Sequence, residues 1–163
     1  AVNVGLSVSR VGGAAQTRAM KSAAGTIRLD LAQYREMEVF TQFSSDLDET
    51  TKRQLVYGQG LMRLLRQAQY HPLAQHEQVI LLTAALGHIM QELSPDQVGR
   101  FEARLLSDVS EQAPDLCQRI DSTGQLSPED RSTIMDLAHR SLYAFQQEEM
   151  AAKQAAAAKK AGE

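Results

Sequence analysis

Apolar residues recur at helical spacing through almost all of the chain beyond Gly25. The clearest series has intervals of 3, 4, 3 and 4 residues: Val79, Leu82, Leu86, Ile89 and Leu93. This spacing places its members on one face of an α-helix, so the series predicts a core helix. Shorter stripes lie within 31–43, 61–65, 98–109 and 135–145. Short helices joined by short loops favour an antiparallel bundle, so we expect a mainly α fold.

Proline, glycine and capping residues indicate where these helices begin and end. Ser94-Pro95-Asp96-Gln97 combines a capping serine, a proline at the first helical position and a glutamine three residues after the cap. Ser127-Pro128-Glu129-Asp130 repeats this start signal. His71-Pro72 is expected to end the preceding helix, because the residue before proline is disfavoured in a helix. Gly58 and Gly60 predict a break or kink between the helix that follows Asp48 and the next one.

The first ten residues follow a different pattern. Val2, Val4, Leu6 and Val8 alternate with small polar residues and glycine, which predicts one β-strand. No later segment alternates in this way, and a lone strand leaves its backbone groups unpaired. We therefore expect the chain to be cut from a longer protein that holds the partner strands.

Three parts are expected along the chain. Residues 1–25 hold the strand and an Ala-rich run, Ala14 to Ala24, that can form a short helix or ordered coil. Residues 26–146 form the helical domain. Residues 147–163, rich in alanine, lysine, glutamine and glutamate, are expected to be a flexible tail.

Composition excludes several classes of protein. The net charge of −3 comes from mixed acids and bases without a basic block, so nucleic acid is not expected as a partner. No stretch approaches the roughly 18 to 20 apolar residues needed to span a bilayer, and the chain is expected to be soluble. The single cysteine, Cys117, cannot form an internal disulfide and is expected to be a buried hydrophobic residue.

Few residues are candidates for chemistry. The sequence contains neither the GxxxxGK[ST] phosphate-loop motif nor the GxGxxG motif. No two histidines have the i, i+4 spacing of a zinc site, so no metal site is expected. Arg10 lies at the end of the predicted strand, just before Gly12-Gly13. In open α/β sheets that position contacts ligands, and a guanidinium there stabilises phosphoryl charge. From position alone, an ordinary surface arginine is the commoner explanation.

Residues 2–17, from Val2-Asn3-Val4-Gly5 to Ala15-Gln16-Thr17, closely resemble the end of the nucleotide-binding domain of F-type ATP synthase alpha subunits. The similarity continues through 29–36, 43–48, 69–73 and 77–79 and covers roughly residues 1 to 145. The resemblance implies a C-terminal helical bundle preceded by one β-strand left from a RecA-like α/β domain.

The resemblance also implies roles for individual residues. Arg10 matches the arginine finger that reaches a nucleotide bound mainly by a neighbouring beta subunit, with Ser7 and Val8 beside it. Gln67 and Gln69 match two glutamines near the adenine of the non-catalytic site. In the turn from Gln91 to Asp96, the residues implied to face the rotor stalk are Glu92, Leu93, Ser94 and Asp96. Ala68 and His71 depart from the glycine and serine often found in the family.

The implied partners are beta subunits in an alternating hexamer ring and the gamma subunit of the central stalk. ATP or ADP with Mg would be cofactors of the complete assembly, and none is expected to bind tightly to this chain. The complex would be peripheral to the inner face of an energy-transducing membrane, either a bacterial plasma membrane or its organellar equivalent. The alternative is a free-standing helical protein-interaction module without a catalytic role.

Overall fold

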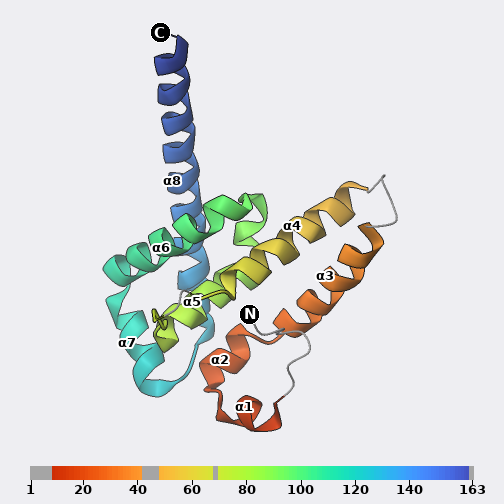
Figure 1. Ribbon diagram of the computed structural model, residues 1–163. Coiled ribbons are helices and arrows are strands. Elements are labelled where there is room, and N and C mark those ends of the chain that lie inside the picture. The colour runs from red at the N-terminus through yellow and green to blue at the C-terminus, as the bar shows by residue number, and fades with distance from the viewer. Residues whose placement is uncertain (1–8, 42–47, 68–69, 162–163) are drawn as a thin grey trace.

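The computed structural model describes residues 9–41, 48–67 and 70–161. Within these ranges the chain forms eight α-helices and one 3-10 turn, η1, and no β-strand (Figure 1). The elements are α1 (Arg10–Ala15), α2 (Arg18–Ala23), α3 (Ile27–Thr41), α4 (Glu49–Leu64), α5 (Gln75–Leu86), η1 (Ile89–Glu92), α6 (Pro95–Gln112), α7 (Pro114–Thr123) and α8 (Pro128–Ala161). The expected mainly α fold is confirmed.

The predicted strand is wrong at its C-terminal end. Ser9 caps α1, and Arg10 is the first residue of that helix. The Ser9 hydroxyl accepts a hydrogen bond from the Gly12 backbone N–H at 2.9 Å, so it starts a helical turn at the point where alternation had suggested extended backbone. The rest of the predicted strand, residues 1–8, lies outside the described residues.

α5 lies at the centre of the bundle. Every residue from Val79 to Ala85 is buried, on all sides of the helix, as expected for a helix that is apolar around its whole circumference. α5 packs against α2, α6, α7, α8 and η1, and Figure 1 shows it between α2 and the group formed by α6, α7 and α8. The predicted core helix is therefore confirmed, although its buried surface is wider than the predicted stripe.

The predicted length of this core helix was wrong. α5 ends at Leu86, and His88 takes a left-handed conformation with φ of 62° before η1 begins. Gly87 allows close packing at this bend, because a Cβ there would lie 2.3 Å from the Cε atom of Met135 on α8. Ile89 and Leu93 stay buried because the chain folds back onto the core after the bend.

The break predicted at Gly58 and Gly60 is also wrong. α4 continues through both glycines from Glu49 to Leu64. A Cβ at Gly58 would lie 2.2 Å from the Tyr34 ring on α3. Gly58 therefore permits the close approach of two helices, and tertiary packing outweighs its poor helix propensity.

α6 and α8 form the other large helix pair. The predicted buried face of α6 is confirmed, since Val98, Phe101, Leu105 and Val109 are fully buried. Both predicted start signals are confirmed as well. The Gln97 side chain accepts from the Ser94 backbone N–H at 3.0 Å, and the Ser127 hydroxyl accepts from the Asp130 N–H at 3.0 Å.

α8 continues past the boundary expected at residue 147 and remains helical to Ala161. Its first residues beyond that boundary are attached to α6. Arg104 donates to the Glu148 carboxylate at 3.0 Å, and Arg100 pairs with the Glu149 carboxylate. The boundary therefore lies inside a helix that is fixed to the domain, and the flexibility of the rest of the tail stays a prediction. Within the described part of the chain, no helix combines the length and apolarity needed to cross a membrane.

Replacing Phe101 with alanine should destabilise the domain strongly. Phe101 is fully buried and meets Phe145 edge to face at a centroid distance of 5.8 Å. The cavity should lower the free energy of unfolding by roughly 3–5 kcal/mol, measured by urea denaturation. The matched control is Tyr143→Ala on α8, because that side chain is 67% exposed and should cost roughly 0.5 kcal/mol or less. Equal losses in the two variants would contradict this account of the core.

Replacing Glu102 with glutamine should change the pH dependence of stability. Burial raises the pKa of this α6 carboxyl to about 7, with only partial compensation from Arg63, and its Oε1 atom has no hydrogen-bond partner among the described residues. The unfolded value is about 4.3. Between these values the native state binds more protons than the unfolded state, so stability falls as pH rises.

Glu102→Gln stays neutral and should therefore be more stable than the wild type at pH 8. We expect its free energy of unfolding to exceed that of the wild type by about 1 kcal/mol, a value that allows for solvent screening of a partly exposed group. This difference should shrink as the pH falls toward 5. Urea denaturation at both pH values measures it. The control is Glu36→Gln on the exposed side of α3, and a gain that does not depend on pH would refute the assignment.

Candidate functional site

Arg10 lies on a helix that contributes nothing to the core. α1 has no buried residues, and the Arg10 side chain is exposed. No ion pair or side-chain hydrogen bond of Arg10 occurs within the described parts of the chain. A guanidinium held at the surface in this way stays charged and keeps all its donors available to a ligand or a partner.

A groove of about 460 Å³ lies beside this helix. Ser9 and Gly13 from the start of the chain line one side, and residues of α2 and the α2–α3 turn, together with Ile27 and Arg28 of α3, line another. Leu65, Gln78 and Leu82 close it from the α4–α5 side. The Arg10 segment is therefore next to the core, although its own side chains are not buried there.

α2 fixes this segment to the domain. Ala19 and Ala23 are fully buried, and α2 packs on α5. The Ala19 backbone N–H donates to the Gly124 carbonyl at 2.9 Å, and Arg131 of α8 donates to the Ser22 carbonyl at 2.9 Å. α2 is thus fixed to the helical domain, and α1 is linked to α2 along the chain through Gln16 and Thr17.

Gln67 lies in the connection between α4 and α5. Its side chain is exposed and lines a cavity of about 60 Å³, together with Leu65, Gln78 and Leu82. The same three residues line the groove beside Arg10, so the structure brings Gln67 and the Arg10 segment to adjacent sides of the α4–α5 junction. The cavity is far smaller than the roughly 300–1,000 Å³ of ligand pockets. Gln67 alone therefore does not form an adenine pocket, and it would contribute one edge of a larger one.

The other residues predicted for these two sites, Gln69, Ser7 and Val8, lie outside the described residues.

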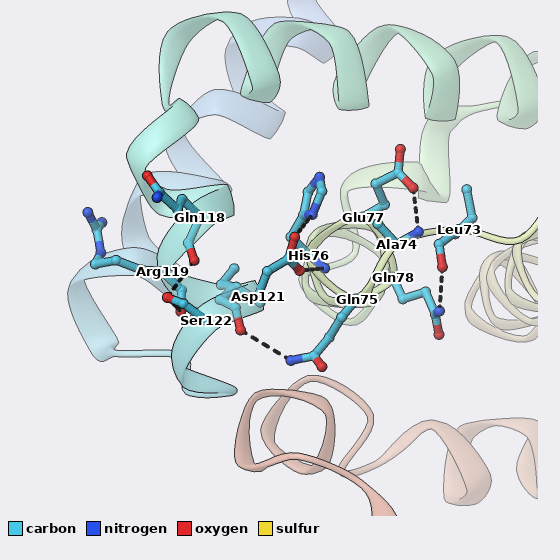
Figure 2. Close-up of polar contacts among 11 residues, drawn as sticks. Leu73, Ala74, Gln75, His76, Glu77, Gln78, Gln118, Arg119, Asp121 and Ser122 are labelled. Carbon is cyan, nitrogen blue, oxygen red and sulfur yellow. Dashed lines mark hydrogen bonds and ion pairs between the residues drawn. The ribbon is translucent and has the colours of Figure 1, made fainter.

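The connection after Pro72 is fixed by hydrogen bonds that sequence reasoning missed. Figure 2 shows the Glu77 carboxylate accepting from the Ala74 backbone N–H at 2.6 Å, and the Gln78 amide donating to the Leu73 carbonyl at 2.9 Å. These bonds fix Leu73 and Ala74 at the N-terminus of α5. Polar residues at the start of an otherwise apolar helix were the available signal in the sequence.

α7 holds the N-terminus of α5 from the other side. Asp121 accepts from the His76 backbone N–H at 3.0 Å, and its second oxygen lies 2.7 Å from His76 Nδ1 (Figure 2). The Gln75 amide donates to the Ile120 carbonyl at 3.2 Å. A carboxylate at the N-terminus of a helix is favourable there, because it satisfies unpaired N–H groups. His76 is thus accounted for by a structural contact, without a metal.

The turn predicted to face the rotor stalk is tied mainly to its own domain. Leu93 is only 3% exposed, so its side chain is part of the core and not available to a partner. Ser94 caps α6, and Asp96 lies 3.7 Å from Arg63 on α4. Glu92 is the last residue of η1, which the Leu93 backbone N–H closes by donating to the Met90 carbonyl. Figure 1 places α1 and the α5–α6 connection at well-separated parts of the bundle, so this turn is not part of the Arg10 site.

Cys117 and the metal-ligating side chains were candidates for chemistry elsewhere in the described residues. Burial raises the pKa of the half-buried Cys117 thiol, which packs against the core as expected for a small hydrophobic residue. No group of three histidine, cysteine, aspartate or glutamate residues in the described ranges is arranged to hold a metal ion. The described residues therefore do not provide a ligand set that fits a resident Mg ion.

Comparisons with known proteins agree with this architecture. The family model for the ATP synthase alpha/beta chain, C terminal domain, matches residues 16–141. The ATP synthase subunit alpha of Petrotoga mobilis is 43% identical over 145 residues, which are 89% of this chain and 29% of that protein. The ATP synthase subunit alpha of Rickettsia bellii is 43% identical over 134 residues, which are 82% of this chain and 26% of that protein.

The chain thus spans less than a third of the length of these relatives. The matched segment begins within the α1–α2 connection and ends in α8, so it includes all of the central packing around α5. Because the family model covers more than half of the sequence, this chain belongs to the ATP synthase alpha/beta chain family, which it matches through the C-terminal domain.

Proposed function

We propose that this chain works as the C-terminal part of an ATP synthase alpha subunit and supplies Arg10 to a nucleotide held mainly by a neighbouring beta subunit. The observation that carries the proposal is the position of Arg10. It is exposed on a helix without buried residues, and its charge is not neutralised by any described side chain. This exposure leaves the Arg10 guanidinium able to reach a neighbouring subunit, and its role is taken from the resemblance of residues 2–17 to alpha subunits.

The chemical role of Arg10 in this proposal is electrostatic. Phosphoryl transfer spreads negative charge over the transferring group and its bridging oxygens, and a fixed guanidinium stabilises that charge. Arg10 itself would form and break no covalent bond. It would contact the phosphates of a nucleotide whose binding site, with its Mg, belongs to the complete assembly. The chain alone is therefore proposed to be inactive.

The helical domain would position Arg10 mechanically. α2 joins α1 to the buried helix α5, and α5 is joined in turn to α7 by the Asp121 contacts. A rigid-body movement of the bundle would displace Arg10 relative to the neighbouring subunit. The central stalk would drive this movement, and its proposed contact at Glu92, Ser94 and Asp96 stays a prediction, with Leu93 supporting the turn from the core.

Gln67 and Gln69 are proposed to bind the adenine edge at the non-catalytic site. An amide offers both a donor and an acceptor, which suits the alternating groups on that edge. This proposal is supported by the exposed position of Gln67 and by the hydrogen bond from Gln78 that fixes Leu73 on α5. The complex would be attached peripherally to an energy-transducing membrane.

Replacing Arg10 with lysine in the complete alpha subunit should sharply reduce multisite ATPase turnover. Lysine keeps the charge but loses the bidentate fork, and complete arginine fingers contribute about 10³ to 10⁵ in rate. Steady-state ATP hydrolysis by the assembled complex measures the effect. The control, Arg18→Lys on the exposed side of α2, should leave turnover within twofold. Normal turnover in an assembled Arg10→Lys complex would refute the role of Arg10.

Replacing Gln67 with leucine should weaken nucleotide binding at the non-catalytic site while leaving hydrolysis at the other sites largely intact. One hydrogen bond contributes roughly 0.5–1.5 kcal/mol, so the dissociation constant should rise about 2-fold to 10-fold. Equilibrium binding of a fluorescent adenine nucleotide to the assembled complex measures it. Gln112→Leu, at the exposed end of α6, is the matched control and should not change the affinity.

A further inference from the structure

A groove between α3 and α4 gathers three arginines around one space. It has a volume of about 590 Å³, and α3 and α4 pack side by side along it. Its polar lining comprises Tyr34, Arg35, Glu38, Gln59, Arg63 and Arg66. Gln67 lines a different cavity, and neither Arg10 nor the α5–α6 turn borders this groove. The groove thus has a different lining from the sites of the proposed function, although Arg63 pairs with Asp96 of the α5–α6 turn and Arg66 directly precedes Gln67.

The positive charges in this groove are poorly compensated. Neither Arg35 nor Arg66 has a side-chain hydrogen bond or ion pair within the described ranges. Arg63 lies 3.7 Å from Asp96, whose side chain is 94% exposed, and such an exposed pair contributes little. Glu38 is the carboxylate in the lining and accepts a hydrogen bond from the Tyr34 hydroxyl at 3.0 Å. The lining thus carries an excess of two positive charges.

Glu102 of α6 only partly offsets the charge of Arg63 at neutral pH. Burial raises the pKa of this carboxyl to about 7, so a large share of it is protonated at neutral pH. Three guanidiniums drawn together without matching carboxylates repel one another, and a bound anion would remove that repulsion.

We infer that this groove binds a small multivalent anion of the diphosphate or triphosphate class. Guanidinium groups bind phosphate oxygens through two parallel hydrogen bonds, and the three arginines approach from α3, from α4 and from the residues just after α4. The Gln59 amide adds a neutral donor. The volume lies within the roughly 300–1,000 Å³ of small-ligand sites.

An acidic protein segment fits this groove less well. Protein docking sites depend on apolar anchors in desolvated pockets, and the apolar side chains in this lining are Val39 and Met62. Val39 is 56% exposed and therefore does not form an enclosed pocket. Charge complementarity without an apolar anchor favours the small anion.

The test is a titration of this 163-residue chain with inorganic pyrophosphate at constant ionic strength. NMR of ¹³C-methyl methionine reports on the groove through Met62, while Met150 on the exposed part of α8 serves as the internal reference. We expect the Met62 signal to shift and saturate and the Met150 signal to stay unchanged. Sulfate should bind at least tenfold more weakly, because it carries less negative charge than pyrophosphate and offers fewer oxygens to the guanidinium groups.

Matched double variants separate a specific site from overall charge. Arg35→Gln with Arg66→Gln should weaken pyrophosphate binding at least tenfold. Arg53→Gln with Arg140→Gln removes the same charge at exposed positions outside the groove and should change affinity less than twofold. If the first pair does not fold by circular dichroism, Arg66→Gln alone, beyond the end of α4, should still weaken binding severalfold.

Three results would overturn the inference. The first is a Met62 signal that does not saturate with pyrophosphate. The second is equal weakening in the two double variants, which would show a general charge effect. The third is binding of a polyglutamate peptide, but not of pyrophosphate, which would assign the groove to a protein partner.

Discussion

The burial of α5 on every side is the constraint on which the rest of the structure depends. A helix with no exposed face over Val79–Ala85 has to be surrounded, and α2, α6, α7, α8 and η1 together surround it. Its two ends are fixed differently. The N-terminus is held by Asp121 through hydrogen bonds, whereas the C-terminus stops at Gly87, where Met135 packs closely. The position of each surrounding helix follows from this central one.

The same packing explains how distant parts of the chain come to the α4–α5 junction. Leu65, Gln78 and Leu82 line both the groove beside α1 and the cavity beside Gln67. Because one set of side chains borders both spaces, a shift of α5 would change both together. In the proposed function, that shared border would couple the Arg10 segment to the adenine edge without any contact between the two residues.

Sequence periodicity predicted the helices and much of the core because burial follows local spacing. The face of α6 from Val98 to Val109 was recovered from its spacing, and both helix starts were recovered from their capping residues. The errors have tertiary causes. Gly58 permits close contact with Tyr34, although glycine locally suggests a break. The regular spacing up to Leu93 hides the bend at Gly87 and His88, because the residues after the bend are buried as well.

The candidate site was less predictable than the fold. The predicted strand end singled out Arg10, and resemblance added Gln67 and a role for each residue. The alternating pattern nevertheless put Arg10 at the end of a strand, whereas the Ser9 cap places it in a helix. The contacts of His76 with Asp121 join residues 45 positions apart, and no local pattern contains that information. Leu93, which resemblance assigns to a partner contact, has a side chain buried in the core, and the contact of its turn with the stalk stays a prediction.

The most direct measurement of the central claim is a structure of an assembled alpha–beta complex that contains this chain, with a transition-state analogue of phosphoryl transfer bound to beta. The account predicts that the Arg10 guanidinium lies within hydrogen-bond distance, roughly 3 Å, of the analogue's terminal oxygens, with α1 reaching across the subunit interface. An Arg10 side chain directed into solvent, with another arginine on those oxygens, would contradict it.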